Sequence, residues 1–370
     1  MSSAAPRTCG SPCDTGSPPV FFSTYTRRTM KSLIAEGSEL TLQEVPDAAI
    51  EKPTDAVVRM VLASVCGSDH HLLEYNIPMA YPIGHEAIGE VVEIGSDISG
   101  LTVGDRVLLA GDVGCGRCQP CRSGSIKRCK NGEFGIYGSP GPLGGCQSEL
   151  IRVPFADFNA LKIPEGITDE QALTITDCLP TAYTAVARAN IRPGGTAAVI
   201  GIGPIGLIAV EVAFALGAAT VYAIDLLDDR LAKAKELGAI ALKPEEALEK
   251  IKADTGGDLV DSVIEAVGAK ATVDLGFQLT GANRTFSILG AVHGVDVTLP
   301  FESVLRGITV TCDQTTEIPL YWPELIPLVQ AGRLHPEIVF TDRFKLDDVK
   351  AAYEKARSRE PGTIKVLIEP

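Results

Sequence analysis

Four cysteines occur within one short stretch of the sequence, at Cys115, Cys118, Cys121 and Cys129. Four thiolates this close along a chain can surround one tetrahedral ion, with each sulfur roughly 2.3 Å from a zinc. Disulfides fit less well, because we find no secretory signal and intracellular thiols stay reduced. A ferredoxin-like iron–sulfur cluster is disfavoured because the fourth cysteine comes too late and is followed by Lys130 instead of proline. The stretch therefore predicts a structural zinc site.

A second group of metal-ligand types lies earlier in the chain. Cys66 and the polar residues directly after it, together with the segment Gly84-His85-Glu86, bring a thiol, an imidazole and carboxylates into two short motifs. A catalytic zinc takes three protein ligands and keeps one position open. Cys66 and His85 are two candidate ligands. The third must come from elsewhere, and the spacing alone does not select it.

A glycine-rich turn indicates a nucleotide site. Residues 196–200 read as a buried strand, and a helical pattern runs from the turn to Leu216. One glycine permits the tight turn, one lets a pyrophosphate approach the backbone, and one packs the helix against the strand. The helix N-terminus then offers free N–H groups to phosphate. The motif consists of Gly201, Gly203, Pro204, Ile205 and Gly206.

The choice of cofactor depends on the end of the next strand, Thr220–Ile224. Asp225 follows it, where a carboxylate can accept hydrogen bonds from an adenosine ribose diol and would repel a 2′-phosphate. We therefore expect NAD as the cofactor in preference to NADP. Arg230 complicates this expectation, since a nearby arginine can receive a 2′-phosphate.

Overall charge narrows the class of partner. The 370 residues carry a formal net charge of −14, which repels phosphate backbones, so we expect no nucleic-acid partner. Residues 196–224 are apolar enough to raise the question of a membrane span. Glu211 and several glycines interrupt that run, so strand, turn and helix explain it better. We expect a small-molecule substrate and no membrane partner.

These motifs require two kinds of architecture to position them. From Met30 to about Val153 short Val-rich strands alternate with glycine turns, which indicates a β-rich domain. From about Thr196 strands alternate with helices, which indicates a doubly wound parallel sheet and an α/β fold class. Residues 1–29, rich in Ser, Thr, Pro and Gly, are expected to form a flexible tail. The chain ends with an expected strand, Ile364–Ile368.

The motifs together resemble those of zinc-dependent medium-chain alcohol dehydrogenases. The resemblance is carried by Cys-Gly-Ser-Asp at 66–69, Gly-His-Glu at 84–86, the four-cysteine loop, residues 176–181 and the glycine turn. It is greatest with the branch of glutathione-independent formaldehyde dehydrogenase-like and secondary-alcohol enzymes, and it covers about residues 30–370. It implies a GroES-like catalytic domain, residues 30–179 plus 317–370, and a Rossmann NAD-binding domain, residues 180–316.

The resemblance also implies the third metal ligand and the cofactor content. Asp177 would join Cys66 and His85, because in this branch an aspartate stands where other members have cysteine. The adjacent Cys178 is the rival ligand. Two zinc ions per chain and NAD are implied, and Thr181 is assigned to the cofactor site. Glu86 would lie behind the ligands or bind the metal transiently.

Further roles follow from the same resemblance. Ser68 would hydrogen-bond the reacting alcohol oxygen, and His71 would be the outer base of a proton relay through the cofactor ribose. Asp69 would orient His85. The expected reaction is the interconversion of an alcohol and an aldehyde or ketone by hydride transfer to NAD. The alternative is a sugar or polyol dehydrogenase on the same scaffold. A cytoplasmic homodimer or homotetramer is expected.

Overall fold

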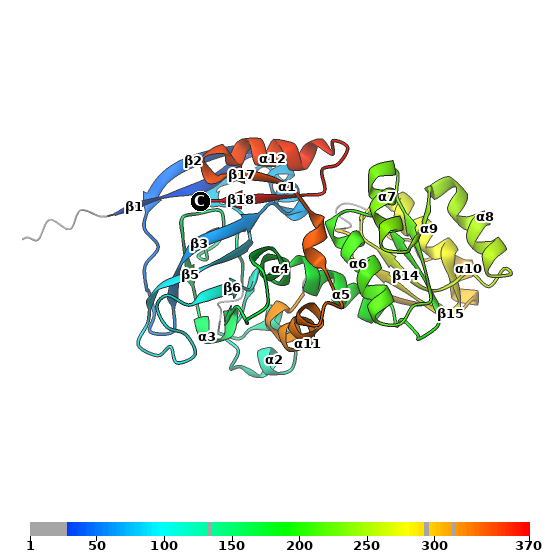
Figure 1. Cartoon of the computed structure of the whole chain (residues 1–370), viewed down its shortest axis with the longest axis horizontal. Coiled ribbons are helices and arrows are strands. Elements are labelled where there is room, and N and C mark those ends of the chain that lie inside the picture. Colours follow the sequence, from blue (N-terminus) through cyan, green and yellow to red (C-terminus); the bar gives the residue numbers. More distant parts are fainter. Residues whose placement is uncertain (1–27, 132–134, 292–295, 313–315) are drawn as a thin grey trace, which may run out of the picture.

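The computed structural model describes residues 28–131, 135–291, 296–312 and 316–370, and the first 27 residues of the expected tail lie outside them. It shows two lobes side by side (Figure 1). A β-rich lobe contains the early strands and the C-terminus, and an α/β lobe is built from the later middle part of the chain. This arrangement confirms the expected fold class.

The β-rich lobe contains two main sheets, with the strand orders β2-β1-β4 and β10-β6-β5-β3-β18-β17. Strand β9 pairs with β3 outside that order. The strands are β1 (Thr29–Gly37), β2 (Glu39–Pro46), β3 (Ala56–Ser64), β4 (Ile77–Pro82), β5 (Glu86–Ile94), β6 (Arg106–Leu109), β9 (Leu150–Val153), β10 (Ala160–Lys162), β17 (Phe340–Lys345) and β18 (Lys365–Glu369). Because β18 pairs antiparallel with β3, the end of the chain lies beside the segment that leads to Cys66.

The α/β lobe is a parallel sheet with the order β13-β12-β11-β14-β15-β16. Its strands are β11 (Thr196–Ile200), β12 (Thr220–Ile224), β13 (Ile240–Leu242), β14 (Val260–Glu265), β15 (Thr280–Ile288) and β16 (Thr309–Cys312). Its helices are α6 (Pro204–Ala215), α7 (Asp228–Glu236), α8 (Pro244–Asp254), α9 (Lys270–Leu279) and α10 (Phe301–Leu305). The strand order reverses beside β11, and ligands of such sheets bind at that point.

Apolar helices join the two lobes. Helix α5 packs against α6 of the α/β lobe and against α4 and α11 on its other side. Residues of all these helices belong to one hydrophobic core, which continues into strands of both lobes. The helices involved are α4 (Asp169–Ile175), α5 (Cys178–Arg188) and α11 (Ile318–Gln330). Within the described residues no helix is long and apolar enough to cross a membrane.

The remaining elements are short or lie near the metal motifs. They are α1 (Gly67–Glu74), α2 (Gln119–Arg122), α3 (Ala156–Asn159), α12 (Val349–Ser358), β7 (Asp112–Val113), β8 (Gly135–Ile136), η1 (Ile126–Arg128), η2 (Pro336–Val339) and η3 (Leu346–Asp348). Helix α1 carries the residues that follow Cys66, a placement that the sequence motif alone did not reveal.

Candidate active site and metal centres

Three potential metal ligands from separate parts of the chain lie close together. Cys66 is the N-cap of α1, His85 directly precedes β5, and Asp177 directly precedes α5. His85 Nε2 lies 3.5 Å from Asp177 Oδ2, and Cys66 Sγ lies 3.9 Å from the same oxygen. One ligand atom from each of these residues, and one from Glu86, all lie within 4.8 Å of one another.

These separations suit a tetrahedral zinc ion. Bonds of roughly 2.0–2.3 Å place neighbouring donors about 3.3–3.8 Å apart in a tetrahedron. The observed 3.5 and 3.9 Å fall at or just beyond this range. A thiolate, an imidazole and a carboxylate are all donors that zinc accepts. The cluster can therefore hold one ion on three side chains and leave a position for a substrate.

Asp69 lies behind His85 and fixes its orientation. The fully buried carboxylate places Oδ1 3.0 Å from His85 Nδ1. Its other oxygen accepts the backbone N–H of Cys66 at 3.0 Å and the hydroxyl of Tyr353 at 3.3 Å. Burial opposes the charged imidazole, but the negative charges of Asp69 and Cys66 raise the pKa of His85 well above its usual value. With Nδ1 engaged, Nε2 is the nitrogen directed at the metal position.

The structure distinguishes Asp177 from its neighbour Cys178. Asp177 belongs to the group of four potential ligands, and Cys178 does not. The Cys178 thiol is buried and donates instead to Glu86 Oε1 at 3.6 Å. Burial favours the neutral acid, but contact with His85 outweighs it and lowers the pKa of Asp177 to about 2. The ionised carboxylate is the form that binds a cation.

Helix α1 presents the two residues expected to handle protons. Ser68 is exposed, and its hydroxyl donates to Cys66 Sγ at 3.3 Å. His71 follows three residues later, so both lie on one side of the helix. Its ring is partly exposed, and Nδ1 lies 3.4 Å from Glu74 Oε2. Asp69, between them in sequence, points inward.

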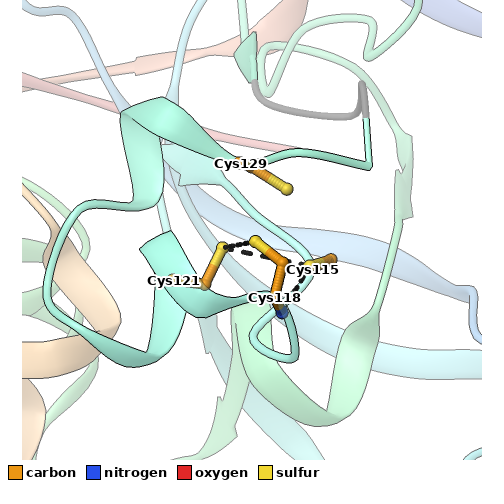
Figure 2. A group of neighbouring side chains, drawn as sticks. All are labelled: Cys115, Cys118, Cys121 and Cys129. Carbon is orange, nitrogen blue, oxygen red and sulfur yellow. Dashed lines mark hydrogen bonds between the residues drawn. The ribbon is translucent and has the colours of Figure 1, made fainter.

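The four-cysteine loop forms a second cluster in which the sulfur atoms converge. Figure 2 shows Cys129 approaching from the side opposite Cys118 and Cys121. The Cys118 and Cys121 sulfurs lie 3.4 Å apart, and those of Cys115 and Cys121 lie 3.9 Å apart. The backbone N–H groups of Cys121 and Lys130 lower the pKa of Cys118 to about 6. A thiolate ready at neutral pH favours metal binding.

The glycine turn has the backbone geometry that a pyrophosphate site needs. Gly201 has φ +89°, a left-handed conformation that glycine adopts without strain. A Cβ on Gly206 would lie 1.7 Å from the carbonyl oxygen of Gly201, so only glycine fits there. Gly203 is the N-cap of α6, whose first turn begins with Pro204 and Ile205. The helix N-terminus therefore faces the turn.

Asp225 lies at the end of β12, beside this turn. Its oxygens accept the backbone N–H groups of Ile202 at 2.6 Å and Leu227 at 2.9 Å. Arg230 on α7 places NH1 4.0 Å from Asp225 Oδ2, and its Nε is a buried nitrogen without a hydrogen-bond partner among the described residues. A carboxylate and a guanidinium thus lie together where an adenosine ribose would bind.

Comparisons with known proteins agree with this geometry. Residues 52–165 match the family model of the alcohol dehydrogenase GroES-like domain. Residues 204–331 match the family model of the zinc-binding dehydrogenases. A probable zinc-binding alcohol dehydrogenase of Mycobacterium tuberculosis is 40% identical over 351 residues, covering 92% of this chain and 89% of that protein. The chain belongs to the zinc-type medium-chain alcohol dehydrogenase family. This dehydrogenase is therefore an oxidoreductase.

A solved structure and a further relative describe the range of this family. The alcohol dehydrogenase TADH from Thermus sp. ATN1 superposes with a TM-score of 0.86 at 33% identity, covering 92% of this chain and 99% of that one. The sorbitol dehydrogenase of Bacillus subtilis is 28% identical over 361 residues, covering 93% and 98% of the two chains. Enzymes named for different substrates thus share this scaffold.

The dehydrogenase contains a buried ion pair that the motifs did not predict. Lys365, at the start of β18, contacts both oxygens of Glu86 at 2.8 and 2.9 Å and donates to the Val65 carbonyl at 3.1 Å. Ser64 also donates its hydroxyl to Glu86. Burial opposes the charge, but Cys178 and Glu86 raise the pKa of Lys365 well above its usual value. The available sequence signal was a lysine inside an otherwise apolar strand.

Two other residues lie close to this site. The Thr181 hydroxyl donates to Asp177 Oδ1 at 3.1 Å, so Thr181 contacts the metal cluster directly. Gly111, next to the zinc loop, is buried, and an added Cβ would lie 3.1 Å from the His85 carbonyl oxygen.

Proposed function

We propose that the protein interconverts an alcohol and an aldehyde or ketone, with NAD as the hydride acceptor or donor. The observation that carries this proposal is the convergence of Cys66, His85 and Asp177, the last of which directly precedes α5, the helix that packs against α6 after the glycine turn. A reactive metal next to a dinucleotide site is what hydride transfer requires. An aspartate at position 177 also supports the formaldehyde dehydrogenase-like or secondary-alcohol branch.

Each residue of the site has a proposed task. Cys66, His85 and Asp177 hold a zinc, which when bound supplies Lewis-acid chemistry to the substrate oxygen. Asp69 orients His85 through Nδ1, and Glu86 remains behind the ligands in its ion pair with Lys365. Ser68 would hydrogen-bond the substrate hydroxyl, and His71 would accept the proton that the substrate releases. Cys115, Cys118, Cys121 and Cys129 hold a second, structural zinc.

Cofactor binding is assigned to the residues around β11 and β12. The N–H groups at the start of α6 receive the pyrophosphate, and Gly201, Gly203 and Gly206 give it room. Asp225 accepts hydrogen bonds from the hydroxyl groups of the adenosine ribose. We propose residues 180–316 as the cofactor domain and residues 30–179 plus 317–370 as the catalytic domain. This division keeps the whole parallel sheet in one unit and returns β17 and β18 to the other.

A substrate screen combined with metal analysis tests the proposal. Protein purified without chelator should contain two zinc ions per chain and should reduce NAD with one or more primary or secondary alcohols. Zinc near one per chain would remove one of the two metal assignments. Absence of NAD reduction with every alcohol class, in fully metallated protein, would refute the dehydrogenase proposal.

A sugar or polyol dehydrogenase is the second candidate. It is favoured by the sorbitol dehydrogenase relative, which is aligned over nearly its whole length. The same screen separates the two, because a polyol enzyme should prefer substrates with neighbouring hydroxyl groups by a clear margin in kcat/KM. Simple aliphatic alcohols should then be poor substrates.

Cofactor preference follows from Asp225. Hydrogen bonds to a charged acceptor contribute about 1.5–3 kcal/mol, so Asp225→Ser should weaken NAD use by roughly 10–100-fold and narrow the gap to NADP. Asp225→Asn removes the charge but keeps an oxygen for the Ile202 or Leu227 N–H, which separates 2′-phosphate repulsion from damage to the turn. The measurement is kcat/KM for both cofactors. Wild-type activity greater with NADP would reject the ribose-diol assignment and implicate Arg230.

The proton relay predicts a pH-dependent defect. His71→Gln should keep both metals and slow alcohol oxidation by up to about 10²-fold at low pH, with partial recovery at high pH, where hydroxide can take the proton. Ser68→Ala should be worse, because it removes the link nearest the substrate. The measurement is a pH–rate profile of both variants beside wild type. A His71→Gln profile that coincides with wild type at every pH would move His71 out of the relay.

We also propose that the protein is a homodimer or a dimer of dimers that associates through the outer strand β16. Unpaired edge strands and exposed apolar patches favour association. Phe301 and Leu305 on α10 are 69% and 72% exposed, and Val310 on β16 is also exposed. Leu305→Asp with Val310→Asp should give a smaller assembly by light scattering, monomers from a homodimer or dimers from a dimer of dimers. Val103→Asp, at a 61% exposed valine of the β-rich lobe, is the matched control and should not change the assembly.

Because the proposed structural site needs reduced thiolates, we propose that the protein works in the cytoplasm.

A further inference from the structure

The connection between α12 and β18 reaches from the β-rich lobe to the cofactor side of the molecule (Figure 1). At its tip Gly362 donates its backbone N–H to Asp229 Oδ2 at 2.7 Å. Asp229 is the second residue of α7, four residues after Asp225 at the proposed ribose site. This hydrogen bond therefore joins the helix beside the proposed ribose site to a segment of the other lobe.

Gly362 makes this contact through its backbone N–H at the tip of the connection. Gly362 has φ +88°, and nothing lies within 4 Å of the position where a Cβ would be. Backbone contact with Gly362 lowers the pKa of Asp229, so the acceptor is a carboxylate at neutral pH. The next residues are held by the β-rich lobe, since Thr363 is buried and Ile364 donates its N–H to Thr341 Oγ1 at 3.0 Å.

The other end of the same segment contacts residues next to the metal ligands. Lys365 comes three residues after Gly362 and contacts Glu86 and the carbonyl oxygen of Val65. Val65 directly precedes Cys66, and Glu86 directly follows His85. We call residues 362–365 the strap. One end is bonded to the cofactor lobe and the other to the chain neighbours of two metal ligands.

We propose that Asp229 is a positioning residue that couples cofactor binding on α7 to the catalytic metal cluster through the strap. The inference rests on the proposed function, because it takes NAD as the ligand of the α/β lobe and a metal ion as the ligand of Cys66, His85 and Asp177. A movement of α7 on cofactor binding would displace Gly362, and the short path through the buried Thr363 to the buried Lys365 would transmit the displacement to Glu86 and Val65. Coupling of this kind is reciprocal between the two ligands.

A simpler role for Asp229 is that of an acid in the first turn of a helix, where negative charge is favourable. Asp228 offers the matched comparison. It lies one residue earlier in the same turn, its side chain is 91% exposed, and it pairs with Lys243 at 2.6 Å within the α/β lobe. If charge alone mattered, the two aspartates would be equivalent. Only Asp229 contacts the strap among the described hydrogen bonds.

The test uses the full-length protein with cobalt(II) exchanged into the Cys66–His85–Asp177 site, titrated with NADH. Visible cobalt absorption reports the metal environment independently of turnover. In wild type, NADH should perturb the cobalt bands. Asp229→Ala should at least halve that perturbation and weaken NADH binding by about three- to tenfold, the loss expected for one hydrogen bond. Asp229→Asn should retain most of the response because its amide oxygen still accepts, and Asp228→Ala should match wild type.

Each other outcome has a defined meaning. A full cobalt response in Asp229→Ala would overturn the inference, and so would a wild-type protein that binds NADH without any cobalt response. Equal losses in Asp228→Ala, Asp229→Asn and Asp229→Ala would overturn it in favour of helix charge. If wild type takes up no cobalt at the site or binds no dinucleotide, the proposed function itself fails. If Asp229→Ala does not fold, Asp229→Leu, which also lacks an acceptor for the Gly362 N–H, is titrated in its place with the same expected loss.

Discussion

Replacement of Asp177 by alanine should remove the catalytic metal and nearly all turnover. An open zinc site depends on three protein ligands, and the alanine variant leaves only Cys66 and His85 to hold the ion. Zinc in such sites contributes several kcal/mol of transition-state stabilisation, so its loss should lower kcat/KM by roughly a thousandfold or more. Metal content by elemental analysis should fall by one ion per chain, since the four-cysteine loop is distant in the sequence and separate in space.

Two neighbouring variants make this experiment specific. Cys178→Ala should keep both metals, because the Cys178 thiol is directed to Glu86 and not into the ligand cluster. Asp177→Cys should recover metal binding, because thiolate is itself a zinc ligand. Loss of metal from Cys178→Ala with retention in Asp177→Ala would show that the ligand assignment is displaced by one residue.

The sequence predicted best those features that a short segment specifies by itself. The glycine turn was predictable because each glycine answers a local need, such as φ +89° at Gly201 and the close approach of Gly206 to its carbonyl. The buried strands β11 and β12 were predictable because strands covered on both faces are mostly apolar. The four-cysteine cluster depends on one loop, so spacing was sufficient to predict that its sulfurs converge.

Features that join distant segments could not be read in this way. The third potential ligand lies 111 residues from Cys66, and no periodicity relates the two positions. Tyr353 supports Asp69 from α12, across 284 residues. Lys365 was overlooked because its strand pattern indicated only burial, and its partner Glu86 lies 279 residues away. Local chemistry identifies the candidates, but the order of strands in the sheet decides which of them meet.

The Lys365–Glu86 pair should be the most costly ion pair to break. Its side chains are 2% and 1% exposed, so Lys365→Met would leave a buried carboxylate without its cation. Breaking such a pair costs about 3–5 kcal/mol, whereas an exposed pair contributes about 0–1 kcal/mol. Lys270→Met is the matched control, because Lys270 pairs with Asp274 at 2.6 Å with 64% and 43% of the two side chains exposed. Urea unfolding followed by circular dichroism should separate the two variants clearly.

A second substitution distinguishes charge burial from loss of packing. Lys365→Met combined with Glu86→Gln removes the orphaned charge while keeping side chains of similar size, and a buried pair replaced in full is often near neutral in stability. We therefore expect the double variant to recover most of the stability lost in Lys365→Met. If the double variant is as unstable as the single one, the contact of Lys365 with the Val65 carbonyl and its packing in β18 carry the stability. If Lys365→Met costs no more than Lys270→Met, the buried pair contributes no more than a surface pair.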